Sequence, residues 1–97
     1  MEPMNVDQYI DDLARAEHTS KEGILKEAVR ALLREKKRAI QSDQLDLLRR
    51  YGVASPNALE ERIRQGQIEE SPAWEDRVAL DNLTSALKQI EHDLAAL

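Results

Sequence analysis

The sequence predicts an all-α fold: a helical hairpin followed by a long helix, a short helix and a C-terminal amphipathic helix. Three observations support this class. Apolar residues recur at spacings of three and four along most of the 97 residues, the period of a helix with one buried face. Charged residues make up 34% of the chain, which is typical of exposed helices. Residues that favour helix N-termini stand at the start of each periodic segment.

The hairpin consists of two helices joined by a polar turn. The first helix is expected from Asn5, a suitable N-cap, to about His18. Thr19 and Glu22 match a capping box, in which a hydroxyl and a carboxylate each accept a backbone N–H, so a second helix starts there. Gly23 in its first turn costs about 1 kcal/mol relative to Ala. We therefore expect another helix to approach closely at Gly23.

The second helix of the hairpin is predicted to continue as one long helix to about Tyr51. No Gly or Pro interrupts it before Gly52, which suits a helix C-terminus because glycine accepts the left-handed conformation. A break at Ser42, which can cap a separate short helix, is the alternative. The first apolar residues of the long helix are expected to form a packing or dimer core with the first helix: Leu25, Val29, Leu32 and Leu33.

Two Ser-Pro pairs predict the starts of the last two helices. In each pair Ser can cap and Pro suits the first helical position. Ser55 begins a short helix that ends before Gly66, and Ser71 begins a helix that runs from Pro72 to about Leu97. We expect residues 1–52 to form a hairpin and dimerisation part and residues 53–97 a C-terminal partner-binding part. A single continuous domain, 1–97, is the alternative.

The last helix carries a heptad seam with apolar residues spaced 3, 4, 3, 4 and 3. The seam consists of Leu80, Leu83, Leu87, Ile90, Leu94 and Leu97. Trp74 and Val78 extend this apolar face toward the helix start. The seam must pack against the long helix of the same chain, a second copy or another protein. Trp74 is either the anchor of a small core or an interface hot spot.

Charge is distributed unevenly along the chain. Residues 21–40 carry seven bases and three acids, whereas residues 67–97 carry two bases and seven acids. The net charge of the whole chain is −5. The basic middle can bind an anion or pair with the chain's own acidic segments.

No residue pattern in the sequence predicts catalytic chemistry. There is no Cys, and the two histidines, His18 and His92, lie in no metal-ligand spacing. We find no nucleophile–base pair and no glycine-rich phosphate loop, so we expect no enzyme, catalytic residue, metal or cofactor. The N-terminus does not resemble a signal peptide, and no apolar run approaches the ~20 residues that span a bilayer. A cytoplasmic protein without a membrane partner is expected.

The stretch "DDLARAEHTSKEGILKEAVRALL", residues 11–33, resembles the two helices of ribbon-helix-helix proteins. Leu13 to Arg15 match the end of the family's first helix, Ser20 and Lys21 match its turn, and the stretch from Ile24 to Leu32 matches its second helix. The strand that precedes these helices in the family is missing, since "MEPMNV" stands in its place. Many members are antitoxins whose C-terminal helical part masks a small toxin, often a ribonuclease. The segment "RRYGVASPNALEERIRQGQIEESPAWEDRVALDNL" also resembles the tails of small prokaryotic antitoxins.

The resemblance and the acidic last helix lead to one main hypothesis for function. We expect a non-enzymatic antitoxin-type protein that binds and masks a small basic toxin, such as a ribonuclease. Acidic side chains mimic phosphate and steer a basic, nucleic-acid-binding partner. The expected partner-binding residues are Trp74, Val78, Leu80, Leu83, Leu87, Ile90 and Leu94.

Two alternatives remain open. One is a DNA-binding transcriptional regulator that contacts phosphates through the basic second helix. Its expected contact residues are Ser20, Lys21, Lys26, Arg30, Arg34 and Lys37. The other is a self-assembling helical dimer whose seam pairs only with itself. A homodimer or higher oligomer is expected in any case, because a chain of this size buries little apolar surface alone.

Overall fold

In the computed structural model, residues 5–97 are described, and within that range the chain forms four α-helices and no strand. The helices are α1 (Val6–Ala16), α2 (Lys21–Arg50), α3 (Pro56–Arg64) and α4 (Glu70–Ala96). The predicted all-α class and the predicted order of helices are therefore confirmed. Most of "MEPMNV", the segment expected in place of a strand, lies outside the described residues.

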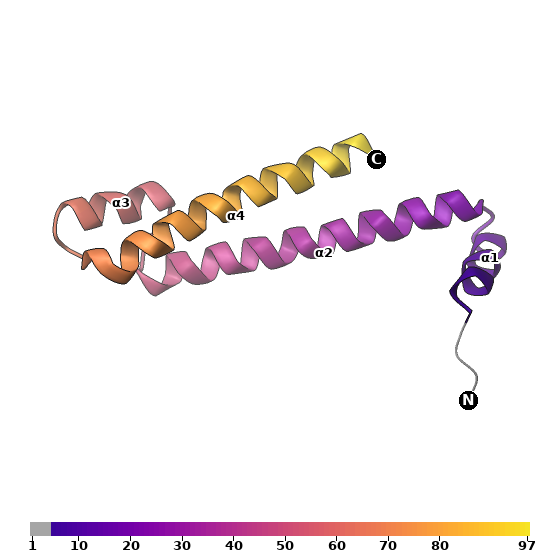
Figure 1. The fold of residues 1–97 in the computed structure, drawn as a ribbon, viewed down its shortest axis with the longest axis horizontal. Helices are drawn as coiled ribbons and strands as arrows, with labels where there is room; N and C mark the ends of the chain where they lie inside the picture. The colour runs from indigo at the N-terminus through magenta and orange to yellow at the C-terminus, as the bar shows by residue number, and fades with distance from the viewer. Residues whose placement is uncertain (1–4) are drawn as a thin grey trace, which may run out of the picture.

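The long helices α2 and α4 lie antiparallel, and α1 lies across the start of α2 at the far end of the molecule (Figure 1). Side-chain contacts fix the register of the pair. Successive α2 residues meet successive α4 residues in reverse order: Arg50 with Asp76, Gln44 with Thr84, Lys37 with Glu91 and Arg30 with the Leu97 carbonyl. Each step is six to eight residues on either helix, close to two turns. Contacts between α2 and α4 therefore cross the expected boundary between residues 52 and 53.

The helix α2 is continuous over 30 residues, as predicted, and does not break at Ser42. Gly52 follows its C-cap with a φ of +64°, the left-handed conformation expected there. The amide of Val53 donates to the Leu48 carbonyl at 3.1 Å, which satisfies one of the free carbonyls at the helix end.

The start of α2 differs from the prediction in two respects. Ser20, not Thr19, is the N-cap, and its hydroxyl accepts a hydrogen bond from the Gly23 amide at 3.0 Å. The close approach at Gly23 is also made by the preceding turn and not by a neighbouring helix. A Cβ atom on Gly23 would lie 2.3 Å from the Thr19 hydroxyl oxygen, so Thr19 of the turn occupies the space.

The two Ser-Pro pairs behave differently despite their similar sequences. Ser55 caps α3 as predicted, and its hydroxyl accepts a hydrogen bond from the Ala58 amide at 3.1 Å. In α4, Ser71 has an extended backbone (φ −109°, ψ 130°) that separates Glu70 from the regular helix beginning at Pro72, and its hydroxyl accepts no hydrogen bond from a backbone amide of the described residues. The Ser71 hydroxyl lies 3.4 Å from the Glu75 carboxylate, directed to a side chain and away from the backbone. Ser71 therefore has the predicted position and the extended backbone of an N-cap, but the prediction that its side chain caps the helix is wrong.

This difference gives a matched pair of substitutions. Ser55→Ala is expected to lower the free energy of unfolding by about 0.5–2 kcal/mol, because one amide of the first turn of α3 loses its acceptor. Ser71→Ala is expected to change it by less than about 0.5 kcal/mol, as for an ordinary surface position. Urea denaturation followed by circular dichroism measures both. Equal losses for the two variants would contradict the observed capping.

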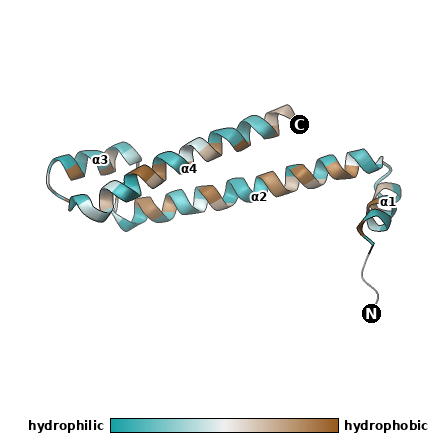
Figure 2. Cartoon of the chain, in the orientation of Figure 1, coloured by the Kyte–Doolittle hydropathy of each residue, from teal (hydrophilic) through white to brown (hydrophobic). Residues whose placement is uncertain are grey.

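The hydrophobic core lies where α3 packs against the start of α4 and the end of α2. It consists of the buried residues Leu59, Ile63, Ala73 and Leu80, against which Leu47, Leu48, Tyr51, Val53 and Ile68 pack. No residue of α2 is buried. The first residues of α2 were expected to form a packing or dimer core with α1. Within the single chain the packing core is wrong, since Leu33 is only half-buried and the other three are exposed: Leu25 44%, Val29 46% and Leu32 57%. The dimer core stays a prediction. Brown, apolar segments recur along α4 and along the whole of α2, including its first half (Figure 2).

Candidate interaction surfaces

The heptad seam of α4 faces α2 of the same chain. Leu80 and Ile90 are buried, whereas Leu83, Leu87 and Leu94 are half-buried. Of the three packing partners that the sequence left open, the long helix of the same chain is therefore the one that the structure shows. Most of the residues expected to bind a partner already have a packing role within the hairpin.

Trp74 and Val78 differ from the rest of that set, because they point away from the core. They are 36% and 56% exposed, and their spacing of four residues places them on one face of α4. Ala73, not Trp74, fills the core at this point. Trp74 is therefore not the anchor of a core within the single chain.

Several carboxylates neighbour these two apolar side chains along α4. Glu75 lies three residues before Val78 and Asp81 three residues after it, on the same helix face. Asp81 forms an ion pair with Arg77 at 2.5 Å. Glu70 and Glu75 are exposed, and neither forms an ion pair within residues 5–97. We call this surface, made of Glu70, Trp74, Glu75 and Val78, the acidic tip.

The basic residues proposed for DNA contact are divided between internal partners and solvent. Ser20 is occupied as the N-cap of α2. Lys21 pairs with Asp7 at 3.2 Å, and Lys37 pairs with Glu91 at 3.7 Å. Arg30 pairs with Glu27 at 2.5 Å and also donates to the Leu97 carbonyl. Lys26 and Arg34 are exposed and form no ion pair with another described residue.

No group of three or more His, Asp or Glu side chains within residues 5–97 is arranged to hold a metal ion. None of the four helices combines the length and the apolarity needed to cross a bilayer.

A model of the family described as "Uncharacterized protein MJ0235 family" matches residues 1–97. The chain belongs to the MJ0235 family. No curated protein and no solved structure matches it. The description of the MJ0235 family states no activity, ligand or partner.

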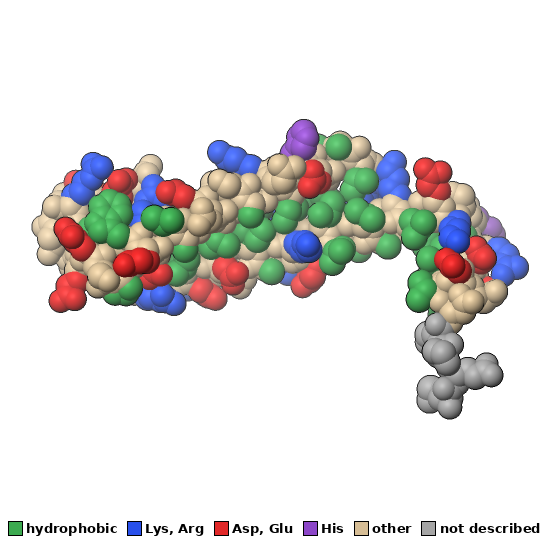
Figure 3. Space-filling view, viewed as in Figure 1, with side chains coloured by type: hydrophobic (Ala, Val, Ile, Leu, Met, Phe, Trp, Pro, Cys, Tyr) green, Lys and Arg blue, Asp and Glu red, His purple; other side chains and the backbone are tan. Residues whose placement is uncertain are grey.

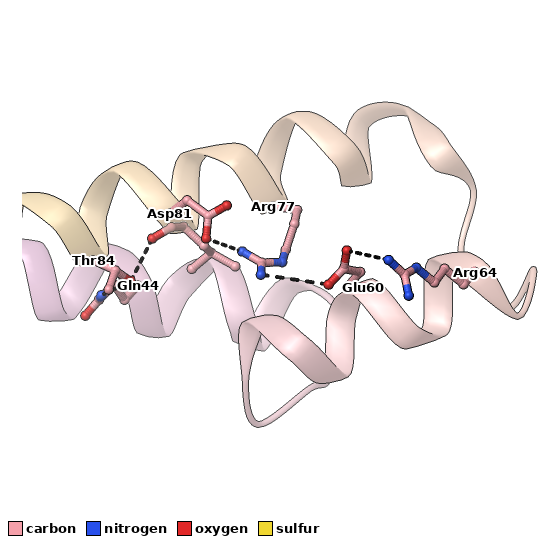
Figure 4. A network of polar contacts seen from close by, with 7 residues as sticks. Gln44, Glu60, Arg64, Arg77, Asp81 and Thr84 are labelled. Atoms are coloured by element: carbon pink, nitrogen blue, oxygen red, sulfur yellow. Dashed lines mark hydrogen bonds and ion pairs between the residues drawn. The ribbon is translucent and has the colours of Figure 1, made fainter.

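In this MJ0235 family member, α3 is tied to α4 by a polar network that sequence reasoning missed (Figure 4). The Arg77 guanidinium lies between two carboxylates, 2.5 Å from Asp81 and 4.0 Å from Glu60. Glu60 also pairs with Arg64 at 3.1 Å. The Arg77 side chain is only 14% exposed, and its Nε has no hydrogen-bond partner within the described residues. The residues 60 and 77 are far apart in sequence, so no local spacing predicts their contact.

A second polar contact joins the end of α2 to the start of α4. The Tyr51 hydroxyl donates to the Asp76 carboxylate, which also accepts from Arg50 at 3.0 Å. Burial raises the pKa of Tyr51 above its ordinary value, and the hydrogen bond to Asp76 and the charge of Asp76 raise it further. The hydroxyl therefore stays protonated as a donor well above neutral pH. This contact links the C-terminal end of α2 to the first turns of α4.

Proposed function

We propose that this chain is a non-enzymatic, antitoxin-type interaction protein that binds and masks a small basic protein, with the acidic tip as the contact surface. The observation that supports this most strongly is the exposure of Trp74 and Val78 beside carboxylates that have no ion-pair partner within residues 5–97. Tryptophan supplies a large apolar surface and is enriched among the residues that dominate binding energy.

The charge of the C-terminal third supports a basic partner. Residues 67–97 carry seven acids and two bases, and one of those bases, Arg77, is already paired with Asp81 and Glu60. A surface of one sign attracts a partner of the opposite sign and discourages others. Small ribonucleases carry such a basic surface for their phosphate-rich substrate, so a ribonuclease-like toxin fits as the masked protein.

The remaining predicted contact residues have an indirect role in this proposal. Leu80, Leu83, Leu87, Ile90 and Leu94 pack α4 on α2, and this packing holds the acidic tip in place. Charged substitutions at Leu83 or Leu87 would disrupt the hairpin together with any binding surface. The test therefore has to use residues of the tip that do not contribute to the core.

The experiment compares three tagged chains in affinity capture from a nuclease-treated lysate of the source organism. We expect the unaltered chain to recover one small basic protein in a stoichiometric amount. Trp74→Ala combined with Val78→Lys is expected to weaken its binding by about 30-fold or more, because the variant removes an interface anchor and places a charge of the partner's own sign in the apolar patch. Leu45→Ala is the control, since Leu45 is exposed to a similar extent at 45% but lies on α2.

The recovered protein is then expressed alone and together with the unaltered chain. Arrested growth and RNA cleavage in the first case, and restored growth in the second, are the expected results. Capture of the basic protein with undiminished affinity by the Trp74/Val78 variant would reject the acidic tip as the contact surface. A captured protein that does not affect growth would reject the antitoxin assignment.

A further inference from the structure

The folded chain is one helix layer thick. Its extents are 61 × 35 × 16 Å, and its radius of gyration is 20.2 Å, against about 13 Å for a compact domain of this length. Stable domains are normally built from two packed layers around a core. The single chain therefore lacks the layer that would cover one face of α2 and α4.

The accessible surface supports the same conclusion. The chain exposes 7265 Å², whereas a compact monomer of 11.1 kDa exposes about 5,700 Å². The excess of about 1,600 Å² exceeds the ~800 Å² per partner that a standard protein interface buries. Enough extra surface is available for a stable dimer.

Most of the large exposed apolar residues belong to α1 and the first half of α2. They are Val6, Tyr9, Leu13, Leu25, Val29 and Leu32, each between 44% and 68% exposed. Two of the α2 members, Leu25 and Val29, line a groove that continues to the end of α4, together with Glu22, Lys26, Ala96 and Leu97. In a space-filling view, apolar side chains form a row along α2 and α4 and also cover part of α1 (Figure 3).

The α2 part of this surface is nearly symmetric about Val29. Glu22, Leu25, Val29, Leu32 and Lys36 are spaced 3, 4, 3 and 4, so they share one helix face. Glu22 lies seven residues before Val29, and Lys36 lies seven residues after it. Both are exposed, and neither forms an ion pair with another of the residues 5–97. We call these five residues the self-complementary stripe.

We infer that a second copy of this chain covers the self-complementary stripe, with the two α2 helices antiparallel and a two-fold axis at Val29. In a two-fold interface the same patch meets itself, so residue i contacts residue j and j contacts i. Val29 then meets Val29 of the other copy, Leu25 packs beside Leu32, and Glu22 of each copy faces Lys36 of the other. The apolar side chains of α1 add to both ends of this interface.

Nucleic acid is a poorer occupant of the stripe than a second copy. Phosphate contact requires cations, but the centre of the stripe is apolar and one end is a carboxylate. A patch that carries one acid and one base at equal distances from its centre has both charges paired when it meets an inverted copy of itself, whereas a partner with charges of one sign pairs only one of them. This charge arrangement favours a second copy over a partner whose charges all have the same sign.

The first test is sedimentation velocity of the full chain over a concentration series. The expected mass is twice the 11.1 kDa of one chain. Val29→Asp places two carboxylates at the axis and is expected to raise the dimer dissociation constant by about 30-fold or more, with unchanged helical circular dichroism. Leu45→Asp is the matched control: Leu45 is equally exposed but lies about 160° around α2 from Val29, and it should leave the dimer intact.

The second test reverses the two charges of the stripe. Glu22→Lys or Lys36→Glu alone sets like charges against each other twice per dimer, so each is expected to weaken association several-fold. The double variant E22K/K36E restores both pairs and is expected to return to the unaltered affinity. An equimolar mixture of the two single variants should form a mixed dimer in preference to either homodimer. A monomeric unaltered chain, a dimer indifferent to Val29→Asp, or a double variant without recovery would each overturn the inference.

Discussion

Leu80→Ala is expected to lower the free energy of unfolding by about 2–5 kcal/mol, the range for a large aliphatic side chain removed from a packed core. Leu80 is 1% exposed and, with Leu59, is one of two large side chains that are fully buried among residues 5–97. The core that surrounds it is small, so neighbouring side chains have little capacity to fill the cavity. Because domains are stable by only about 5–15 kcal/mol, the loss removes a large part of the total.

Urea denaturation followed by far-ultraviolet circular dichroism measures this loss, at one fixed protein concentration because dimerisation would add to the apparent stability. Leu45→Ala is the control, since it makes the same chemical change at a side chain that is 45% exposed. The control should change the free energy of unfolding by less than about 0.5 kcal/mol. A loss below about 1 kcal/mol for Leu80→Ala would show that α4 does not pack on α2 and α3 as the structure describes.

The second large effect is expected at Asp76, where Asp76→Ala should cost about 1–3 kcal/mol. Its carboxylate accepts a hydrogen bond from Tyr51 and forms an ion pair with Arg50 at 3.0 Å, while its side chain is only 17% exposed. Removing it leaves the half-buried Tyr51 hydroxyl without its partner. Leaving a buried donor unpaired costs more than the hydrogen bond itself contributes.

A double-mutant cycle separates this contact from other effects of the substitution. Tyr51→Phe and Asp76→Ala are combined, and their joint loss is expected to be smaller than the two single losses together by at least about 0.5 kcal/mol. Asp46→Ala is the control, because Asp46 is exposed and forms no ion pair within residues 5–97. Strictly additive losses would contradict a direct Tyr51–Asp76 contact.

The predicted helices were recognisable because their signals are local. Asn5 caps α1 and Ser55 caps α3 as expected, and Gly52 ends α2 in the left-handed conformation. The two wrong capping predictions also concerned local structure, but their outcome depended on competition between nearby side chains for the same hydrogen bonds. Ser20 caps α2 instead of Thr19, and the Ser71 hydroxyl is directed to Glu75 instead of a backbone amide. Sequence alone does not decide between two neighbouring hydroxyls.

The candidate sites depended much more on packing between distant segments. The heptad spacing identified the seam of α4, but only the folded hairpin shows that Leu80 and Ile90 face α2 while Trp74 and Val78 face solvent. The basic stretch of α2 was visible in the charges, yet the pairing of Lys21 with Asp7 and of Lys37 with Glu91 depends on how the chain folds back. These pairings leave Lys26 and Arg34 as the unpaired members of that set within residues 5–97.

The sequence by itself determined the all-α class, the four helices and their order, because helix period, capping and termination depend on residues within a few positions of one another. Only the tertiary structure decided which apolar faces are covered, because coverage depends on the antiparallel register of α2 and α4 and on where α3 closes the core. That register buries the seam, ties Asp76 to Tyr51 and leaves the first half of α2 exposed. An apolar stripe has the same sequence pattern whether its partner is the same chain or another one.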